Sequence, residues 1–315
     1  EGDQQLLRSD PTHPAHATRD AGDVGHAPGC AVAVGGLGCL PVMEELLITS
    51  PANPRLKALA GLRRRRARET EGRTLIEGFE ELELALAAGV VPRAVFYCPD
   101  LMADPDAQVR LVRDAAAQGT EVVRLGRAAF EKVAYREGPD GFLAVVDTVT
   151  RSCADLEVPD RALVLLCEAV EKPGNLGAML RTADAAGVDA VVAADPVTDW
   201  GNPNLVRASK GTVFSVPVVS DPTDTALAWL ADRGIPLVAA TPDTDVEYTE
   251  VDYTGPVAVA VGAEKTGLTD RVLAAATHRV RIPMVGRANS LNVSTSAAVI
   301  TYEAVRQRRA ATRGG

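Results

Sequence analysis

The segment Val257–Asp270, with the sequence VAVAVGAEKTGLTD, joins an apolar run to a glycine-containing turn that carries a Lys-Thr pair. Phosphate-binding P-loops share this outline of strand, glycine loop, lysine and helix. A P-loop also needs glycine directly before its lysine and again five residues earlier, and these positions hold Glu264 and Val259 here. Because both glycines are absent and a carboxylate would repel a triphosphate, the segment does not predict a nucleoside triphosphatase.

A second segment, Glu168–Val192, carries polar residues that could serve chemistry. Its strand-like start leads to Pro173, which favours the first turn of a helix, and Asn175 and Arg181 follow within that helix. Taken alone, Asn175 is explained as a helix cap and Arg181 as a surface charge. The sequence GAMLRTADAAG around Arg181 is rich in small residues, however, which predicts a closely packed helix and favours a specific partner for the arginine.

A third segment, Ile282–Arg309, leaves a short strand through Ile-Pro-Met and enters a loop before a long helix from about Ser290 to Arg309. Polar side chains at the start of a helix are typical of capping. The residues Ser290, Asn292, Ser294 and Ser296 are more than one cap requires. The helix start therefore predicts a functional site as well as a cap.

The elements that must position these segments form an α/β unit over residues 161–315. Its apolar runs alternate with helical stretches, which predicts a mostly parallel sheet covered on both faces. The predicted strands are ALVLLC, DAVVAA, SVPVV, PLVAA, VAVAV and HRVRIP. In such sheets, ligands bind in the loops beyond the carboxyl ends of the strands. All three segments follow predicted strands, so we expect them at this edge.

The rest of the chain divides into three parts by composition. Residues 43–148 alternate short strands and helices and predict a smaller N-terminal α/β domain. Residues 149–160 have the character of a linker. Residues 1–42 are rich in Gly, Pro, His and Asp without helical periodicity, and we expect a disordered leader or a non-native extension.

Composition limits the cellular setting. No apolar run approaches the roughly 18 residues that a membrane span needs, and we expect no membrane partner. The five cysteines are scattered without a C-x-x-C pair, which indicates a reducing compartment and a cytoplasmic protein. Three of the four histidines lie in the leader (His13, His16 and His26), where a rigid scaffold for a metal site is lacking, so we expect no metal.

The chain has a formal charge of −9, which by itself argues against binding to nucleic acid. Local patches decide such binding, and positive charge is concentrated at Leu62–Arg68 and Val305–Arg313. Each run alone is explained as a solvated helix face.

Together, the sequences NLGAMLRTADAAG, VGAEKTGL and IPMVGRANSLNVSTSAAVITYE resemble motifs one, two and three of the SpoU/TrmH group of SPOUT RNA 2′-O-ribose methyltransferases. They occur in the order of that family and span about residues 160–305. The N-terminal domain resembles the ribosomal-protein-L30e-like substrate-binding domain of its rRNA-modifying members. The chain is most similar to the antibiotic-resistance 23S rRNA methyltransferases of actinomycetes, of the thiostrepton- and avilamycin-resistance type.

The resemblance implies a SPOUT domain with a trefoil knot, an exception to the usual topology rules, that binds S-adenosylmethionine (AdoMet). It implies a cofactor pocket made by Ala240, Gly262, Ile282, Met284 and Leu291. Glycine at 262 would let the backbone approach the ligand closely, and the apolar side chains suit an adenine slot. Arg181 matches the essential arginine of motif one. Since a guanidinium is effectively always protonated, we expect it to position the RNA and stabilise charge on the 2′-oxygen.

The remaining expectations concern supporting residues and partners. Asn175, Glu264, Ser290 and Asn292 are expected to orient Arg181, the ribose and the cofactor. In this family context, the RNA-binding residues are expected to be Arg63, Arg64, Arg65, Arg66, Arg207 and Lys210. Lysine at 210 replaces the arginine of the thiostrepton-resistance type, which keeps the charge and loses the bidentate geometry.

The resemblance also implies a homodimer that packs through the knot and the last helix. The apolar face of SAAVITYEAV is compatible with this interface and equally with coverage of its own sheet. The expected substrate is 23S rRNA. A tRNA substrate is the main alternative, and a non-catalytic RNA-binding module is another, although such a module would not need Asn175, Arg181 and Asn292.

Overall fold

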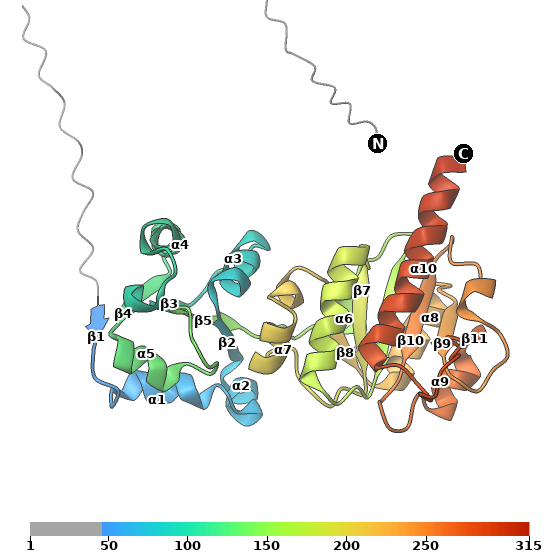
Figure 1. Cartoon of the computed structure of the whole chain (residues 1–315), viewed down its shortest axis with the longest axis horizontal. Helices are drawn as coiled ribbons and strands as arrows, with labels where there is room; N and C mark the ends of the chain where they lie inside the picture. The colour runs from blue at the N-terminus through green and yellow to red at the C-terminus, as the bar shows by residue number, and fades with distance from the viewer. Residues whose placement is uncertain (1–45, 315) are drawn as a thin grey trace, which may run out of the picture. The chain divides into compact units, whose positions relative to one another are not determined.

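The computed structural model describes residues 46–314, in which the chain forms two β-sheets (Figure 1). The predicted leader, 1–42, lies outside the described residues, as does Met43, where the fold was expected to begin. No helix in the described range is long and apolar enough to cross a bilayer.

The second sheet has six strands in the order β11-β9-β10-β6-β7-β8, and every pair is parallel. Its strands are β6 (Leu163–Glu168), β7 (Ala190–Ala194), β8 (Val218–Asp221), β9 (Leu237–Ala240), β10 (Val257–Val261) and β11 (His278–Val280). The apolar runs that predicted these strands lie within or next to them, and the expectation of a mostly parallel sheet is confirmed. The order of the strands was not predictable, because it depends on crossovers between distant segments.

Alternating residues of this sheet enter two separate cores, which is why its central strands are apolar on both faces. On one face, Leu163 and Leu165 pack with Met179 of helix α6 and Ile300 of helix α10. On the other face, Val164 packs with residues of helices α8 and α9. These helices are α6 (Pro173–Ala186), α8 (Thr223–Asp232), α9 (Asp270–Ala275) and α10 (Val293–Gly314). Figure 1 shows α6 and α10 side by side.

The first sheet has five strands in the order β1-β4-β3-β5-β2 and mixes parallel with antiparallel pairs. Its strands are β1 (Leu46–Ile48), β2 (Arg73–Glu77), β3 (Ala94–Tyr97), β4 (Glu121–Leu125) and β5 (Phe142–Asp147). Its helices are α1 (Pro54–Gly61), α2 (Arg65–Glu71), α3 (Phe79–Ala87), α4 (Pro105–Ala117) and α5 (Arg127–Val133). Short strands and helices alternate along this part of the chain, as the sequence predicted.

Several contacts join the two sheets, and we call the set Arg68, Thr74, Asp199 and Gly201 the sheet junction. The guanidinium of Arg68, whose side chain is 2% exposed, binds both carboxylate oxygens of Asp199 at 2.9 and 2.5 Å. Thr74 in β2 donates its hydroxyl to the carbonyl of Gly201. Gly201 lies two residues before the short helix α7 (Pro203–Ala208), so the start of that helix is joined to the first sheet.

Arg308 in the last helix, α10, binds the backbone of the second sheet's domain. Arg308 donates to the carbonyl oxygens of Tyr253 at 3.0 Å, Arg161 at 2.8 Å, Ala162 at 3.1 Å and Gly255 at 2.7 Å. These carbonyls lie just before β6 and β10. A residue from the basic run at Val305–Arg313 is therefore structural, and its guanidinium binds backbone rather than RNA.

Candidate active site

The three sequence motifs meet at the carboxyl ends of neighbouring parallel strands. Asn175 lies in α6, which follows β6; Glu264 lies in the turn after β10; and Asn292 directly precedes α10, beyond β11. Strands β6 and β10 pair directly, so the first two segments emerge side by side. This is the edge at which the sequence predicted ligand binding.

Hydrogen bonds join Asn175, Glu264 and Asn292, which we call the motif cluster. The amide of Asn292 donates from Nδ2 to Oδ1 of Asn175 at 3.1 Å, and Nδ2 of Asn175 donates to Oε1 of Glu264. Oδ1 of Asn292 also accepts from the backbone N and the hydroxyl of Ser294, at 3.0 and 2.6 Å. Asn175 therefore does not cap its own helix; it links all three motifs through both ends of its amide.

Arg181 lies on a different face of α6 from the motif cluster. The six residues from Asn175 to Arg181 correspond to about 9 Å along the helix and a rotation of about 120° between the two side chains. Arg181 shares a stripe with Gly177 and Asp184, whose spacings of four and seven residues return to one face. Its side chain is exposed, with no hydrogen bond or ion pair to any residue in the range 46–314. Among the described residues, Arg181 therefore makes no hydrogen bond to Asn175, Glu264, Ser290 or Asn292, and their expected role in orienting it stays a prediction.

That stripe of α6 packs against α7 and the turn that follows it. A Cβ at Gly177 would lie 2.6 Å from the Cβ of Ala208, so glycine is needed for this close approach. At one end of the stripe, the hydroxyl of Ser215 donates a hydrogen bond to the carboxylate of Asp184 at 3.1 Å. The prediction of a closely packed helix is confirmed, and the packing leaves Arg181 open to solvent.

The segment Ile282–Leu291 has the chemistry of a ligand-binding wall. In the described structure, none of its backbone N–H or C=O groups makes a hydrogen bond, and neither does Ser290 through its side chain. Apolar side chains here are exposed, with Met284 at 38% and Leu291 at 37%. Unpaired backbone groups beside apolar side chains fit an adenosine, whose ring is apolar on its faces and forms hydrogen bonds at its edge.

The other predicted cofactor residues lie at the ends of the strands beside this segment. Ala240 is half-buried at the end of β9, and Ile282 is half-buried just beyond β11, which pairs with β9. Gly262 follows β10, the strand on the other side of β9. The five residues therefore come from three segments that leave the carboxyl ends of the neighbouring strands β9, β10 and β11, and their role as a cofactor pocket stays a prediction.

The structure gives a different reason for glycine at 262 from the one that the sequence indicated. A Cβ at this position would lie 2.2 Å from the carbonyl carbon of Gly267 and 2.4 Å from the nitrogen of Leu268. Gly267 itself has a positive φ of 69°. The missing side chain thus makes room for the returning turn, and close approach of a ligand is not needed to explain it.

The predicted RNA-binding run Arg63–Arg66 separates into two groups. Arg63 is half-buried and donates to the carbonyls of Val133 and Ala134, the latter at 2.8 Å, while Arg65 binds Glu69 at 2.7 Å and the carbonyl of Val197 at 2.8 Å. Arg64 and Arg66 are exposed, and their guanidinium groups bind no described residue. The free charge in this run is therefore carried by Arg64 and Arg66.

The two predicted basic residues of the α7 region also differ from each other. Lys210, whose φ is 55°, binds Glu80 at 2.9 Å and lies 3.7 Å from Glu81, both in α3. The hydrogen bond that Lys210 donates to Glu80 raises the pKa of Lys210 above its usual value. Lys210 is thus engaged by carboxylates of the first sheet, contrary to an open phosphate contact. Arg207 is exposed and lies over the ring of Tyr135, 5.9 Å from its centroid.

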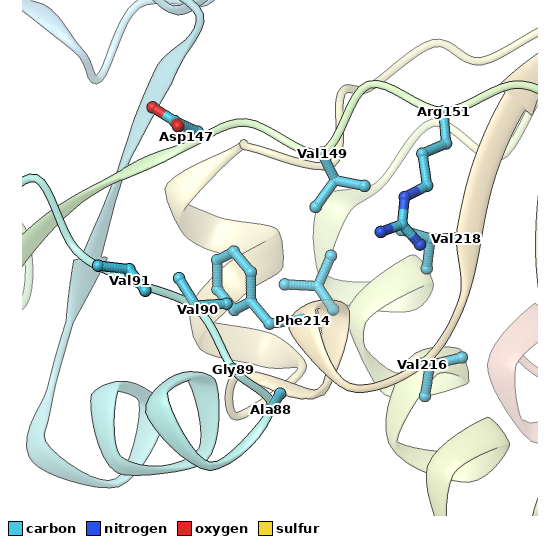
Figure 2. Close-up of a pocket in the computed structure, with 11 residues that line it drawn as sticks. Ala88, Gly89, Val90, Val91, Asp147, Val149, Arg151, Phe214, Val216 and Val218 are labelled. Atoms are coloured by element: carbon cyan, nitrogen blue, oxygen red, sulfur yellow. The ribbon is translucent and has the colours of Figure 1, made fainter. Parts of the chain in front are cut away.

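A cavity of about 370 Å³ lies elsewhere, where the linker passes between the two sheets. Figure 2 shows Arg151 extending over its apolar wall, which includes Phe214, Val216 and Val218. Val218 begins β8 at the amino edge of the sheet, whereas the motif cluster lies at the carboxyl edge. The cavity is therefore separate from the candidate active site.

Sequence reasoning missed two features beside the site. Tyr135 was not noticed, because a lone tyrosine in a loop carries no periodic signal. Glu168 is 1% exposed at the end of β6 and accepts hydrogen bonds from the N and Oγ of Thr269, at 2.8 and 2.7 Å, which fixes the start of α9. A charged residue ending the apolar run LVLLCE was the available signal for Glu168.

Fold and site together define an α/β methyltransferase of the SPOUT class. A crystal structure of the SpoU methyltransferase AviRb from Streptomyces viridochromogenes in complex with AdoMet matches with a TM-score of 0.73 and 28% identity, over 82% of this chain and 98% of that chain. Residues 162–302 match the SpoU rRNA Methylase family, and residues 53–144 match the MRM3-like substrate binding domain.

Two relatives show the range of RNA substrates. The 23S rRNA (uridine(2479)-2'-O)-methyltransferase of Streptomyces viridochromogenes is 31% identical over 269 residues, which cover 80% of this chain and 88% of the relative. The tRNA (guanosine(18)-2'-O)-methyltransferase of Escherichia coli is 39% identical over 161 residues, 50% of this chain and 69% of the relative. The chain belongs to the SpoU rRNA methylase family and is an RNA 2′-O-methyltransferase with AdoMet as its cofactor.

Proposed function

We propose that this chain methylates the ribose 2′-oxygen of one nucleotide in 23S rRNA. The observation that carries the proposal is the motif cluster, which joins three distant segments beside the unpaired backbone of Ile282–Leu291. The five-stranded sheet supports an rRNA substrate over tRNA. The match to the E. coli tRNA relative covers half of this chain, whereas the match to the 23S rRNA relative covers four fifths.

Different site residues are expected to bind the cofactor and to align the 2′-oxygen with the methyl group. When bound, AdoMet supplies an activated methyl group, so the protein must bring the 2′-oxygen into line with it. Ala240, Gly262, Ile282, Met284 and Leu291 would hold this cofactor. The motif cluster holds the turn after β10 and the start of α10 in fixed positions around the cofactor. Ser290 is exposed beside the cluster and can contact the ribose.

Arg181 acts from the neighbouring face of α6. Its charge is permanent, so it stabilises the negative charge that develops on the 2′-oxygen or binds an adjacent phosphate, and it does not remove the proton. Because its side chain has no partner within the described chain, it is available to RNA. Arg64, Arg66 and Arg207 supply further cations for the phosphate backbone.

The proposal extends to the assembly and the biological role. We infer a homodimer that uses the exposed part of α10, including Tyr302, which is 48% exposed. We further infer that the enzyme protects the ribosome from an antibiotic such as avilamycin or thiostrepton. This inference rests on the overall likeness to the actinomycete resistance enzymes. The trefoil knot, the domain roles and a cytoplasmic location stay predictions.

One experiment tests the function directly. The protein is incubated with labelled AdoMet and unmodified 23S rRNA, 16S rRNA or tRNA. The modified position is then mapped by reverse-transcription stops at low nucleotide concentration. We expect label in one nucleotide of 23S rRNA. Label in tRNA alone would establish the alternative substrate, and absence of label from every RNA would support a non-catalytic RNA-binding module.

A further inference from the structure

Tyr135, just after α5, presents an exposed aromatic ring between two arginines. The residue is 39% exposed. The guanidinium carbon of Arg63 lies 5.4 Å from the ring centroid, and that of Arg207 lies 5.9 Å from it. Arg63 comes from the segment before α2 in the first sheet's domain, and Arg207 comes from α7. The ring therefore lies between elements of the two sheets.

The ring and its inner arginine are held in place by the backbone around them. The carboxylate of Glu77 accepts hydrogen bonds from the backbone N of Tyr135 at 2.8 Å and of Arg136 at 3.2 Å. Arg63 is held by the carbonyls of Val133 and Ala134. A surface fixed in this way loses little conformational freedom when a ligand binds.

The outer arginine is held much less firmly. Arg207 is exposed, and within residues 46–314 its guanidinium has no hydrogen bond or ion pair besides its contact with the ring. Unpaired RNA bases stack on aromatic rings and on the planes of guanidinium groups. A base can therefore displace Arg207 from Tyr135 or stack over both.

The position of this pair connects it to the proposed methyl-transfer site. Arg207 directly precedes Ala208, the residue that packs against Gly177 of α6. Gly177 is one helical turn before Arg181. Arg207 therefore links the Tyr135 ring, through α7, to the helix that carries Arg181. Arg63, the other arginine at the ring, is followed in the sequence by the free cations Arg64 and Arg66.

We propose that Tyr135 and Arg207 form a stacking platform for an unpaired base of the RNA substrate, near the nucleotide that is methylated. This role rests on the proposed function, because it requires an RNA substrate. Tyr135 is here a positioning residue that acts on binding. A purely structural role, in which the ring only joins the two sheets, is the competing explanation that the test must separate.

The test compares variants at this position by steady-state kinetics with labelled AdoMet and unmodified 23S rRNA. Tyr135→Leu keeps apolar contact between the sheets but cannot stack a base, whereas Tyr135→Phe keeps the ring and loses only the hydroxyl. We expect Tyr135→Leu to raise the KM for RNA about 5- to 150-fold, the range measured for loss of one base–aromatic stack. We expect Tyr135→Phe to stay within about twofold of the native protein, and both variants to keep their AdoMet affinity.

A direct probe removes any dependence on protein stability. Tyr135→Trp introduces a fluorescent ring at the platform, while the native Trp200 and Trp229 are buried and give the background. Stacking predicts that 23S rRNA quenches the variant more strongly than the native protein. Equal quenching in both proteins, or a Leu variant with the native KM, would overturn the platform. If the native protein methylates no RNA, the proposed function fails; if it methylates 23S rRNA and the quenching is equal, only the platform fails.

Discussion

At the carboxyl edge of the six-stranded sheet, Arg181 is exposed and has no partner among the described residues, and the cluster beside it is held by exposed amides. At the sheet junction, Arg68 is 2% exposed and both of its outer nitrogens and its Nε are bonded. The same residue type thus joins two parts of the fold in one region and, under the proposed function, is left free to bind RNA in the other. What separates the two uses is whether the chain itself supplies the partner.

The largest expected effect is at Arg181. Replacing it by alanine removes the cation next to the developing negative charge, so we expect methyl transfer to fall at least about 10³-fold, comparable to loss of an oxyanion-hole donor. AdoMet affinity and the unfolding midpoint should be unchanged, because no described contact is lost. Methyl transfer with labelled AdoMet and calorimetric binding measure the two properties. An Arg181→Ala enzyme with the native rate would remove the distinction between the two regions.

At the sheet junction, the main expected effect is a loss of stability. Arg68→Met leaves the carboxylate of Asp199 without its partner, and we expect a loss of about 3–5 kcal/mol in the free energy of unfolding. The matched control is Arg271→Met, which breaks an exposed pair with Asp224 and should cost less than about 1 kcal/mol. Denaturant unfolding gives both values. Equal losses would mean that burial at the junction adds nothing.

Replacing Asn292 should lower the rate of methyl transfer less than replacing Arg181 does. Asn292→Ala breaks the hydrogen bond to Asn175 and frees the start of α10, which misplaces the site by a small distance. We expect kcat to fall about 10- to 100-fold, since displacements of the order of 1 Å can cost this much. Thr295→Ala, an exposed change one turn further along α10, is the control and should leave kcat unchanged. Identical kinetics for the two variants would show that the cluster does not align the reaction.

The smallest effect is expected from the free arginines of the first sheet's domain. Replacing Arg64 and Arg66 together by glutamine removes two phosphate contacts, so the slope of log affinity against log salt should become shallower by about 1.4 to 1.8. Filter binding of 23S rRNA at several salt concentrations measures this slope. The control replaces Arg110 and Arg113 in α4, two exposed arginines with no described partner, by glutamine. The same change of slope in both pairs would show that general charge, and not this location, binds the RNA.

The fold was largely predictable because its signals are local. Apolar runs such as VAVAV, and the alternation of strands with helices, predicted a parallel sheet with ligands at its carboxyl edge. The order of the motifs predicted that Asn175, Glu264 and Asn292 would lie together, and the structure brings them within hydrogen-bonding distance. Membership of the methyltransferase family and the AdoMet cofactor are confirmed as well.

The parts that were not predictable depend on partners far away in sequence. Nothing in the run Arg63–Arg66 shows that Arg63 binds carbonyls some 70 residues later, or that its neighbour Arg68 binds Asp199. Nothing near Lys210 indicates Glu80. Whether a cation is free for RNA is thus decided by the tertiary fold, and the sequence shows only that the cation exists. The roles of the individual site residues stay predictions.

The four carbonyls bound by Arg308 have a consequence for how the enzyme is made. They belong to residues just before β6 and β10, so α10 can be fastened only after those strands have formed. Since α10 is also the last element of the described chain to leave the ribosome, Asn292 joins Asn175 late in synthesis. A partly synthesised chain can therefore present the basic surface of the first sheet before it can align a methyl group.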